Sequence, residues 1–216
     1  MSFLSDAKEI GEILATIPKK WDGKKVILEM KSVGFPHWRQ MEWMGFYFQF
    51  LCNKYLSSIM QIPGPKYGRV EFDGFKNIAW DFKAHAINTS SHKIIVNDSE
   101  SIAYAIGKHG AFGLILALGK VLYNDEDKTF KKWHDDLKGG QSEYERKRIE
   151  RGAWSRLRKV SVDLEQIAFI KITDTTLVKC GSFQVDFRNS NGNLRKAKVL
   201  LDLEDIDEEL EYTLDF

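Results

Sequence analysis

One stretch near the middle of the chain, Arg69 to His85, constrains the fold more than any other. Val70 to Asp73 and Ile78 to His85 have the composition and spacing of two strands joined by a short turn. Side chains alternate across a strand, so the second segment places Asp81, Lys83 and His85 on one face and apolar side chains on the other. The pattern predicts a sheet that carries charged groups on an otherwise apolar strand.

The charged groups of this stretch have the composition of a metal site. Asp73 stands at the end of the first predicted strand, and Asp81 stands two residues before Lys83 on the second. Two carboxylates that converge can hold a hard divalent cation such as Mg2+. A lysine beside them can orient an attacking water, or help to deprotonate it, so the expected reaction is hydrolysis of a phosphodiester.

The order of these residues resembles that of a known enzyme family. Asp73, followed by Asp81-Phe82-Lys83 and preceded by a helix with Glu42, resembles the PD-(D/E)xK nuclease superfamily. Phe72 stands where the motif has proline, and the size of the chain resembles that of the type II restriction endonucleases.

The resemblance implies both a fold and a function. The fold is α/β with a restriction-endonuclease-like core, in which helices flank a mixed β-sheet. Asp73 and Asp81 would bind Mg2+, Lys83 would orient the water, and Glu42 would support the site. The substrate would be double-stranded DNA, cut at a specific short sequence.

A second copy of the same pattern lies earlier in the chain. Lys25 to Lys31 alternates as a strand would, and Asp22, Glu29 and Lys31 repeat the metal-site spacing. The copy at Asp73 is preferred, because a long helix with Glu42 precedes it and the elements that complete a sheet follow it.

Two residues near the preferred copy have alternative interpretations. Glu42 lies beside the apolar stripe of a predicted helix from Trp38 to Met60, where it is either a solvated flank or a group directed at the metal. His85 shares a face with Lys83 and is either a supporting or solvated group or a general base.

The remaining pattern predicts one domain spanning residues 1–216, with a C-terminal β-hairpin near 181–203 around Asn191-Gly192. A strand is expected at each of four segments: His92 to Val96, Phe112 to Tyr123, Glu165 to Ile172 and Gly181 to Phe187. A helix is expected at Ser5 to Thr16, Ser99 to Lys108, Thr129 to Leu137 and Ser142 to Lys159.

Charge is strongly segregated although the net charge is only +1. The C-terminal residues from Val199 onward are acidic, whereas the predicted helix from Ser142 to Lys159 is basic. That helix is either a solvated face or a set of phosphate contacts that position DNA beside the metal. The candidate DNA-binding residues are Arg146, Lys147, Arg148, Arg151, Arg156 and Arg158.

Cysteine usage and the N-terminus predict a cytoplasmic protein. Cys52 and Cys180 have the spacing of neither a disulfide framework nor a zinc site. Asp6 and Glu9 stand where a secretory signal would need a basic start. A palindromic DNA site presents two equivalent strands, so a homodimer is expected.

Three functions remain open at this point. The first is a Mg2+-dependent type II restriction endonuclease, and the second is a DNA repair or junction-resolving nuclease of the same fold. The third is a DNA-binding protein without catalysis, in which Asp81 and Lys83 form an ordinary ion pair.

Overall fold

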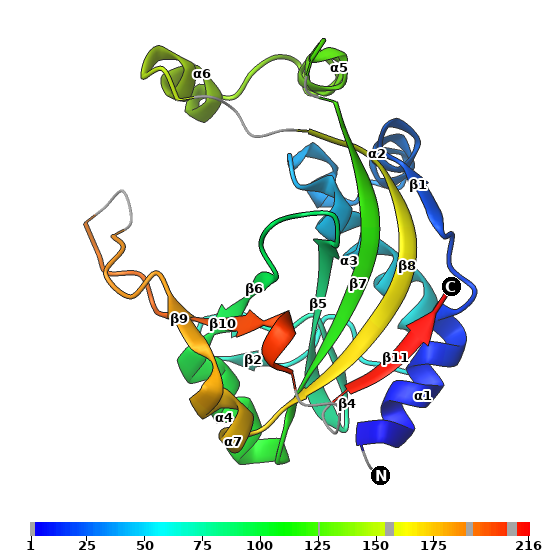
Figure 1. Cartoon of the computed structure of the whole chain (residues 1–216), viewed down its shortest axis with the longest axis vertical. Helices are drawn as coiled ribbons and strands as arrows, with labels where there is room; N and C mark the ends of the chain where they lie inside the picture. Colours follow the sequence, from blue (N-terminus) through cyan, green and yellow to red (C-terminus); the bar gives the residue numbers. More distant parts are fainter. Residues whose placement is uncertain (1–2, 125, 154–157, 189–191, 207–210) are drawn as a thin grey trace.

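A computed structural model describes residues 3–124, 126–153, 158–188, 192–206 and 211–216 of the chain (Figure 1). Its main element is a curled, mixed sheet with the strand order β1-β8-β7-β5-β4, in which β11 also pairs with β8. The pairing of β5 with β7 is parallel and the other pairings are antiparallel. The strands are β1 Lys20–Asp22, β4 Gly74–Lys76, β5 Ile78–Ala86, β7 Phe112–Asn124, β8 Arg158–Ile172 and β11 Glu211–Asp215. The fold is therefore mixed α/β.

Strand β7 lies between β5 and β8 and is buried on both faces. Its sequence is a continuous apolar run rather than an alternating one, as expected for a strand covered on both sides. The predicted strand at Phe112 to Tyr123 is thus confirmed. Leu114 and Leu116 enter one hydrophobic cluster, while Ile115 and Ala117 enter the other.

The first cluster lies between the sheet and three helices near the N-terminus. These are α1 Phe3–Leu14, α2 Gly23–Ser32 and α3 Trp43–Leu56, with a 3-10 turn, η1 Pro36–Arg39, before α3. The predicted first helix is confirmed, although it begins two residues before Ser5, which was expected as its cap. The predicted long helix from Trp38 is divided into η1 and α3.

The second cluster packs on the opposite face of the sheet. It includes a smaller sheet with the order β6-β10-β9, together with the helices α4 and α7. Asp98 caps α4 by accepting from the Ser101 N–H at 2.9 Å, and Gly110 ends it with φ of 78°. The elements are β6 Lys93–Asp98, α4 Ser99–His109, α7 Asp174–Lys179, β9 Gly181–Phe183 and β10 Lys198–Asp202.

Strands β9 and β10 pair antiparallel, so the predicted C-terminal hairpin is present with shorter strands than expected. Its expected centre at Asn191-Gly192 lies only partly within the described residues, since 189–191 are outside them. Two further short strands, β2 Lys66–Tyr67 and β3 Val70–Glu71, pair with each other. The predicted strand from Val70 to Asp73 therefore ends before Asp73.

Helices α5 Thr129–Leu137 and α6 Glu143–Glu150 follow β7 and precede β8 in the chain, and they lie beyond the end of the sheet (Figure 1). The helix predicted from Ser142 to Lys159 ends early, because the chain turns through Gly152 with φ of 67° and Arg158 begins β8. Cys52 is buried, Cys180 is half-buried, and both are free cysteines. Within the described residues, no helix combines the length and apolar character needed to cross a membrane.

Candidate active site

Strand β5 carries the predicted charged pair. Lys83 Nζ lies 2.8 Å from Asp81 Oδ2, and the Asp81 side chain is only 2 % exposed. Trp80 and Phe82 point to the opposite face and join the first cluster, so the predicted alternation along this strand is confirmed. A carboxylate buried this deeply requires compensation, which the lysine supplies in part.

Asp73 reaches the same place from the loop that precedes β4. Strand β4 pairs with β5 only from Ile78 to Trp80, and beyond that point the Phe82 N–H donates to Asp73 Oδ2 at 2.7 Å. The other carboxylate oxygen, Oδ1, accepts from Gln49 Nε2 of α3 at 2.9 Å. Asp73 is therefore fixed at the edge of the sheet by one donor from β5 and one from a helix.

Electrostatically, the site has two carboxylates and one ammonium group. Burial, followed by the charge and hydrogen bonding of Asp81, raises the pKa of Asp73 to about 8, although Lys83 and the Phe82 N–H act in the opposite direction. Burial alone would lower the pKa of Lys83, but the carboxylates of Asp81 and Asp73 outweigh it, so this pKa is raised. The lysine is therefore charged, and at pH 7 the raised pKa keeps a proton on Asp73, so a cation bound by both carboxylates would displace this proton.

One carboxylate oxygen of this site is fully buried. Among the described residues, the contact of Asp81 Oδ2 is the ion pair with Lys83 Nζ at 2.8 Å. A buried carboxylate is costly unless a donor or a cation compensates it, and Lys83 does so in part. A divalent cation held between Asp73 and Asp81 fits this donor set, since hard cations bind carboxylate oxygen.

The protein supplies only part of a coordination shell. No group of three His, Cys, Asp or Glu side chains within the described part of the chain is arranged to hold a metal. Mg2+ commonly keeps several waters and uses one or two carboxylates together with substrate phosphates. Asp73 and Gln49 also line a cavity of about 200 Å³, in which Asn53, Glu71 and His37 are further lining residues.

Glu42 was predicted to support the site, and the structure contradicts this. Helix α3 begins at Trp43, so Glu42 is at its N-terminal end rather than within it. Its carboxylate forms an ion pair with Lys159 of β8, 2.5 Å away. The position on α3 that does meet the site is Gln49, seven residues later on the same side of the helix.

The alternative copy of the motif is not a site. The predicted strand from Lys25 to Lys31 is wrong, because this segment belongs to α2. Asp22 caps that helix by accepting from the Lys25 N–H at 3.0 Å, whereas Glu29 accepts from Tyr47 Oη at 3.1 Å and pairs with Lys54. Lys31 lies over the ring of Trp38, with Nζ 5.0 Å from its centroid, so the three side chains serve separate contacts.

His85 lies farther along β5, on the same side as Lys83. Its Nε2 is 3.0 Å from the Ser91 carbonyl oxygen, so this nitrogen carries a proton and donates it. Burial lowers the pKa of His85, and the ring is therefore neutral at pH 7. These contacts favour the interpretation of His85 as a supporting group.

The predicted DNA-binding residues divide into three groups. Arg146, Lys147 and Arg151 are exposed on or just after α6, and Arg148 is half-buried. Arg156 lies outside the described residues. Arg158 is buried on β8, where burial lowers its pKa and the carboxylates of Glu145, Asp135 and Glu42 lie nearby, so its prediction as a phosphate contact is wrong.

Searches of protein-family models, of curated proteins and of solved structures found no match to this chain.

The contact of Gln49 with Asp73 makes it a positioning residue for the candidate site. Replacing Gln49 with leucine should weaken Mg2+ binding by about 10-fold, since groups that orient metal ligands typically contribute 10- to 100-fold to metal affinity or activity. Calorimetric titration with Mg2+ measures this. Asn53→Leu, which changes a residue lining the same cavity, is the control. Equal Mg2+ affinities of both variants and the parent would show that Gln49 has no such role.

Proposed function

We propose that this chain is a Mg2+-dependent endonuclease that hydrolyses phosphodiester bonds in double-stranded DNA, built on a restriction-endonuclease-like core. One observation carries the proposal: Asp73, Asp81 and Lys83 meet at the edge of β5, where Lys83 pairs with a buried carboxylate oxygen of Asp81. This combination of groups suits metal-assisted hydrolysis.

Asp73 and Asp81 are the residues that would hold the cation. Bound Mg2+ would offset negative charge at the scissile phosphate and make a bound water more acidic. The hydrogen bonds from Gln49 and from the Phe82 N–H keep Asp73 oriented. The Phe82 hydrogen bond and the charge of Lys83 favour the ionised carboxylate, which is the form that binds a cation, against the burial that raises the pKa of Asp73.

Lys83 would act on the nucleophile. Its ammonium group is anchored by Asp81 and its side chain is 28 % exposed, so it is both fixed and accessible. From this position it would donate to the attacking water and orient it toward the phosphate. The positive charge of Lys83 would also stabilise the negative charge that increases on the phosphate in the transition state.

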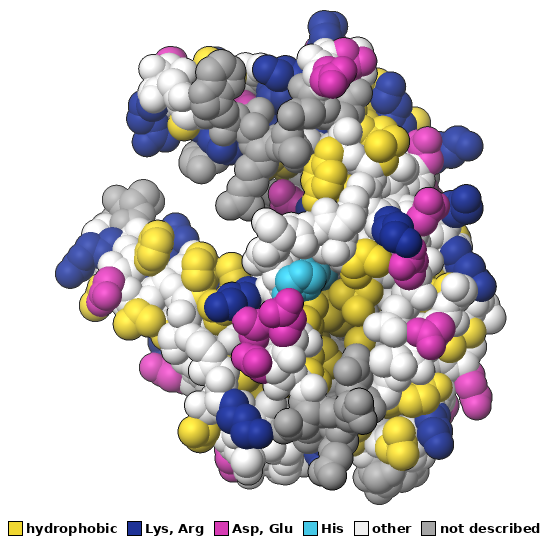
Figure 2. Space-filling view, viewed as in Figure 1, with side chains coloured by type: hydrophobic (Ala, Val, Ile, Leu, Met, Phe, Trp, Pro, Cys, Tyr) yellow, Lys and Arg dark blue, Asp and Glu magenta, His cyan; other side chains and the backbone are white. Residues whose placement is uncertain are grey.

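The basic side chains of α6 support a polyanionic substrate. Arg146, Lys147 and Arg151 are exposed, and Figure 2 shows Lys and Arg side chains on the projection that carries α6, beside a hollow in the surface. Contacts of this kind would position the phosphate backbone without reading sequence. Cleavage at a specific short site by a homodimer, one protomer for each strand, completes the proposal.

Incubation of the purified protein with mixed-sequence duplex DNA and Mg2+ tests the proposed function directly. Discrete fragments are expected from an endonuclease of the site-specific restriction type. Random degradation would support nuclease activity but would contradict site-specific cleavage of the restriction type. Absence of cleavage on every duplex and with every divalent cation would contradict the nuclease proposal.

Removal of the metal should abolish cleavage. In excess EDTA we expect no product, because Asp73 and Asp81 would repel both each other and the phosphate without a cation. Mg2+ or Mn2+ should restore cutting, whereas Ca2+ should permit binding with little turnover. Cleavage that continues undiminished in EDTA would exclude the metal-dependent mechanism.

A further inference from the structure

A projecting arm connects β9 to β10. It comprises residues 181–188 and 192–198 of the described chain, and β9 anchors it to β10. Farther out, Arg188 and Leu194 form an antiparallel bridge, and the Arg195 N–H donates to the Phe187 carbonyl oxygen at 2.7 Å. The guanidinium of Arg188 donates to the Gly192 carbonyl oxygen at 2.7 Å. The arm is thus an ordered hairpin, held together by hydrogen bonds between its two strands.

The arm exposes large apolar side chains to solvent. Val185, Phe187 and Leu194 are 55 %, 56 % and 59 % exposed. Phe187 stacks on Phe183 with 6.1 Å between ring centroids, so the ring is held in place while one side stays open. A group of exposed apolar side chains on one projection is typical of an interaction surface.

The charge of the arm indicates which partner fits. Within its described residues it has one acidic side chain, Asp186, and the basic side chains Arg188, Arg195, Lys196 and Lys198. Lys196 pairs with Glu100 of α4 at the base of the arm. The basic excess would repel a second copy of the same arm and attract a polyanion.

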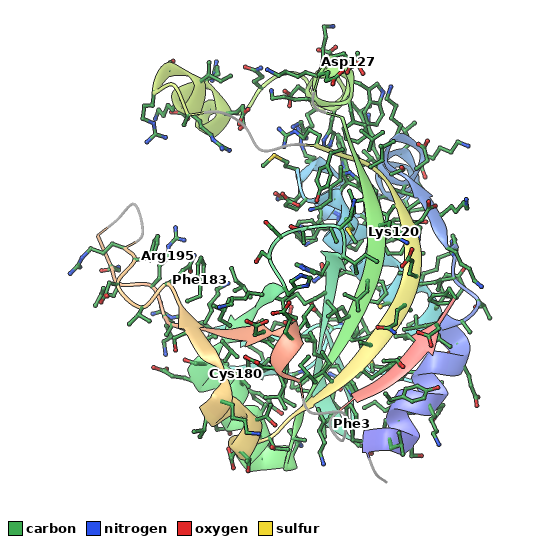
Figure 3. The ribbon with its side chains drawn as sticks, in the orientation of Figure 1. Phe3, Lys120, Asp127, Cys180, Phe183 and Arg195 are labelled. Atoms are coloured by element: carbon green, nitrogen blue, oxygen red, sulfur yellow. The ribbon has the colours of Figure 1, made fainter. Side chains whose placement is uncertain are left out.

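The position of the arm agrees with this partner. Figure 3 places Phe183 and Arg195 on the arm, across the open side of the molecule from the projection with α6. Figure 2 shows the surface hollowed between these two projections. Helix α6 and the arm therefore border the same hollow.

We infer that the arm is a second DNA-binding element, which contacts a duplex opposite α6 and places the Phe187 ring in a groove. This rests on the proposed function, since it assumes that the substrate is DNA. Apolar side chains that enter a groove wedge between base steps, and flanking basic residues neutralise phosphates. Phe187 would supply the first contact and Arg195 the second.

The test measures duplex binding by the full chain in Ca2+, so that cleavage does not interfere. Phe187→Ala should weaken affinity by about 10-fold, as expected for loss of an aromatic contact with bases, whereas Phe187→Tyr should restore it. Arg195→Ala should reduce the slope of log affinity against log salt by about one. Val178→Ala, at an exposed position on α7 outside the arm, is the matched control and should bind as the parent does.

Each result decides the inference. If the parent binds and Phe187→Ala binds equally well, the arm inference fails and the proposed function stands. If the parent binds no duplex, both fail together. If Phe187→Ala changes a dimer into a monomer in sedimentation while each chain binds DNA as before, the arm is a contact between copies and the inference is overturned.

Discussion

Replacing Lys83 with alanine should reduce single-turnover cleavage of duplex DNA by about a thousandfold, within the range by which a positioned proton-transfer group accelerates a reaction. Affinity for DNA should change little, because in the proposed mechanism the lysine would act on the water in the transition state. The fold should also survive at pH 7. Without the ammonium group, Asp73 and Asp81 can share one proton, as two adjacent buried carboxyls do.

Lys31→Ala is the matched control for this prediction. Lys31 occupies the corresponding position of the alternative copy of the motif, but it lies on α2 over the ring of Trp38. It should cut at nearly the parental rate. Single-turnover cleavage and circular dichroism of both variants provide the measurement. An inactive but folded Lys31→Ala beside an active Lys83→Ala would reverse the assignment of the site.

Gly113→Ala should lower the free energy of unfolding by about 3 kcal/mol, near the upper end of the usual cost of overpacking. Gly113 on β7 is opposite Trp80 on β5, and a Cβ added there would lie 2.3 Å from Trp80 Cε3. The Trp80 ring is fully buried and stacks on Phe3, so it has little room to move. Urea denaturation measures the change.

Gly107→Ala is the control for this second prediction. Gly107 lies within α4, and an added Cβ would meet nothing within 4 Å. Alanine should stabilise that helix by about 0.5–1 kcal/mol. If both variants were as stable as the parent, the close contact between β7 and Trp80 would be of no energetic importance. Trp80 is also the residue before Asp81, so Gly113→Ala should slow cleavage as well.

The sequence predicts the β5 half of the site because the pattern there is local. Alternation along Ile78 to His85 is enough to place Asp81 and Lys83 on one face, and the structure confirms it. The predicted proximity of Asp73 to these residues also agrees with the structure, although Asp73 lies in a loop rather than at a strand end. Short-range periodicity and a short connection leave few alternatives for such neighbouring residues.

The pattern misleads where two periodicities coincide. In Lys25 to Lys31 the buried residues are Val26, Ile27 and Met30, which is helical spacing, while Leu28 is 46 % exposed. Apolar residues at successive positions satisfy either period in so short a run. The distinguishing signal is Asp22, whose side chain caps the helix at Lys25.

The rest of the site depends on tertiary contacts that no local pattern specifies. Glu42 forms an ion pair with Lys159, a residue distant in sequence. Gln49 reaches Asp73 only because α3 packs beside β5. A sequence signal for Gln49 exists, since it is a polar residue on an apolar helix, two turns after Glu42. The burial of Arg158 likewise follows from the position where β8 begins.

The connection between β7 and β8 has a consequence for how such a chain can diversify. Asn124 and Arg158 are directly paired, so the last residue of β7 and the first residue of β8 are neighbours in the sheet. A connection whose two ends are paired changes length at small entropic cost, and strand β5 does not take part in it. Phe130 is buried in the first cluster, and Trp133 and Leu137 pack against that cluster, so α5 attaches this connection to the core. Changes to α6, by insertion, deletion or exchange, would alter what the protein binds. They would leave the arrangement of Asp73, Asp81 and Lys83 unchanged. Binding preference and chemistry can therefore evolve separately.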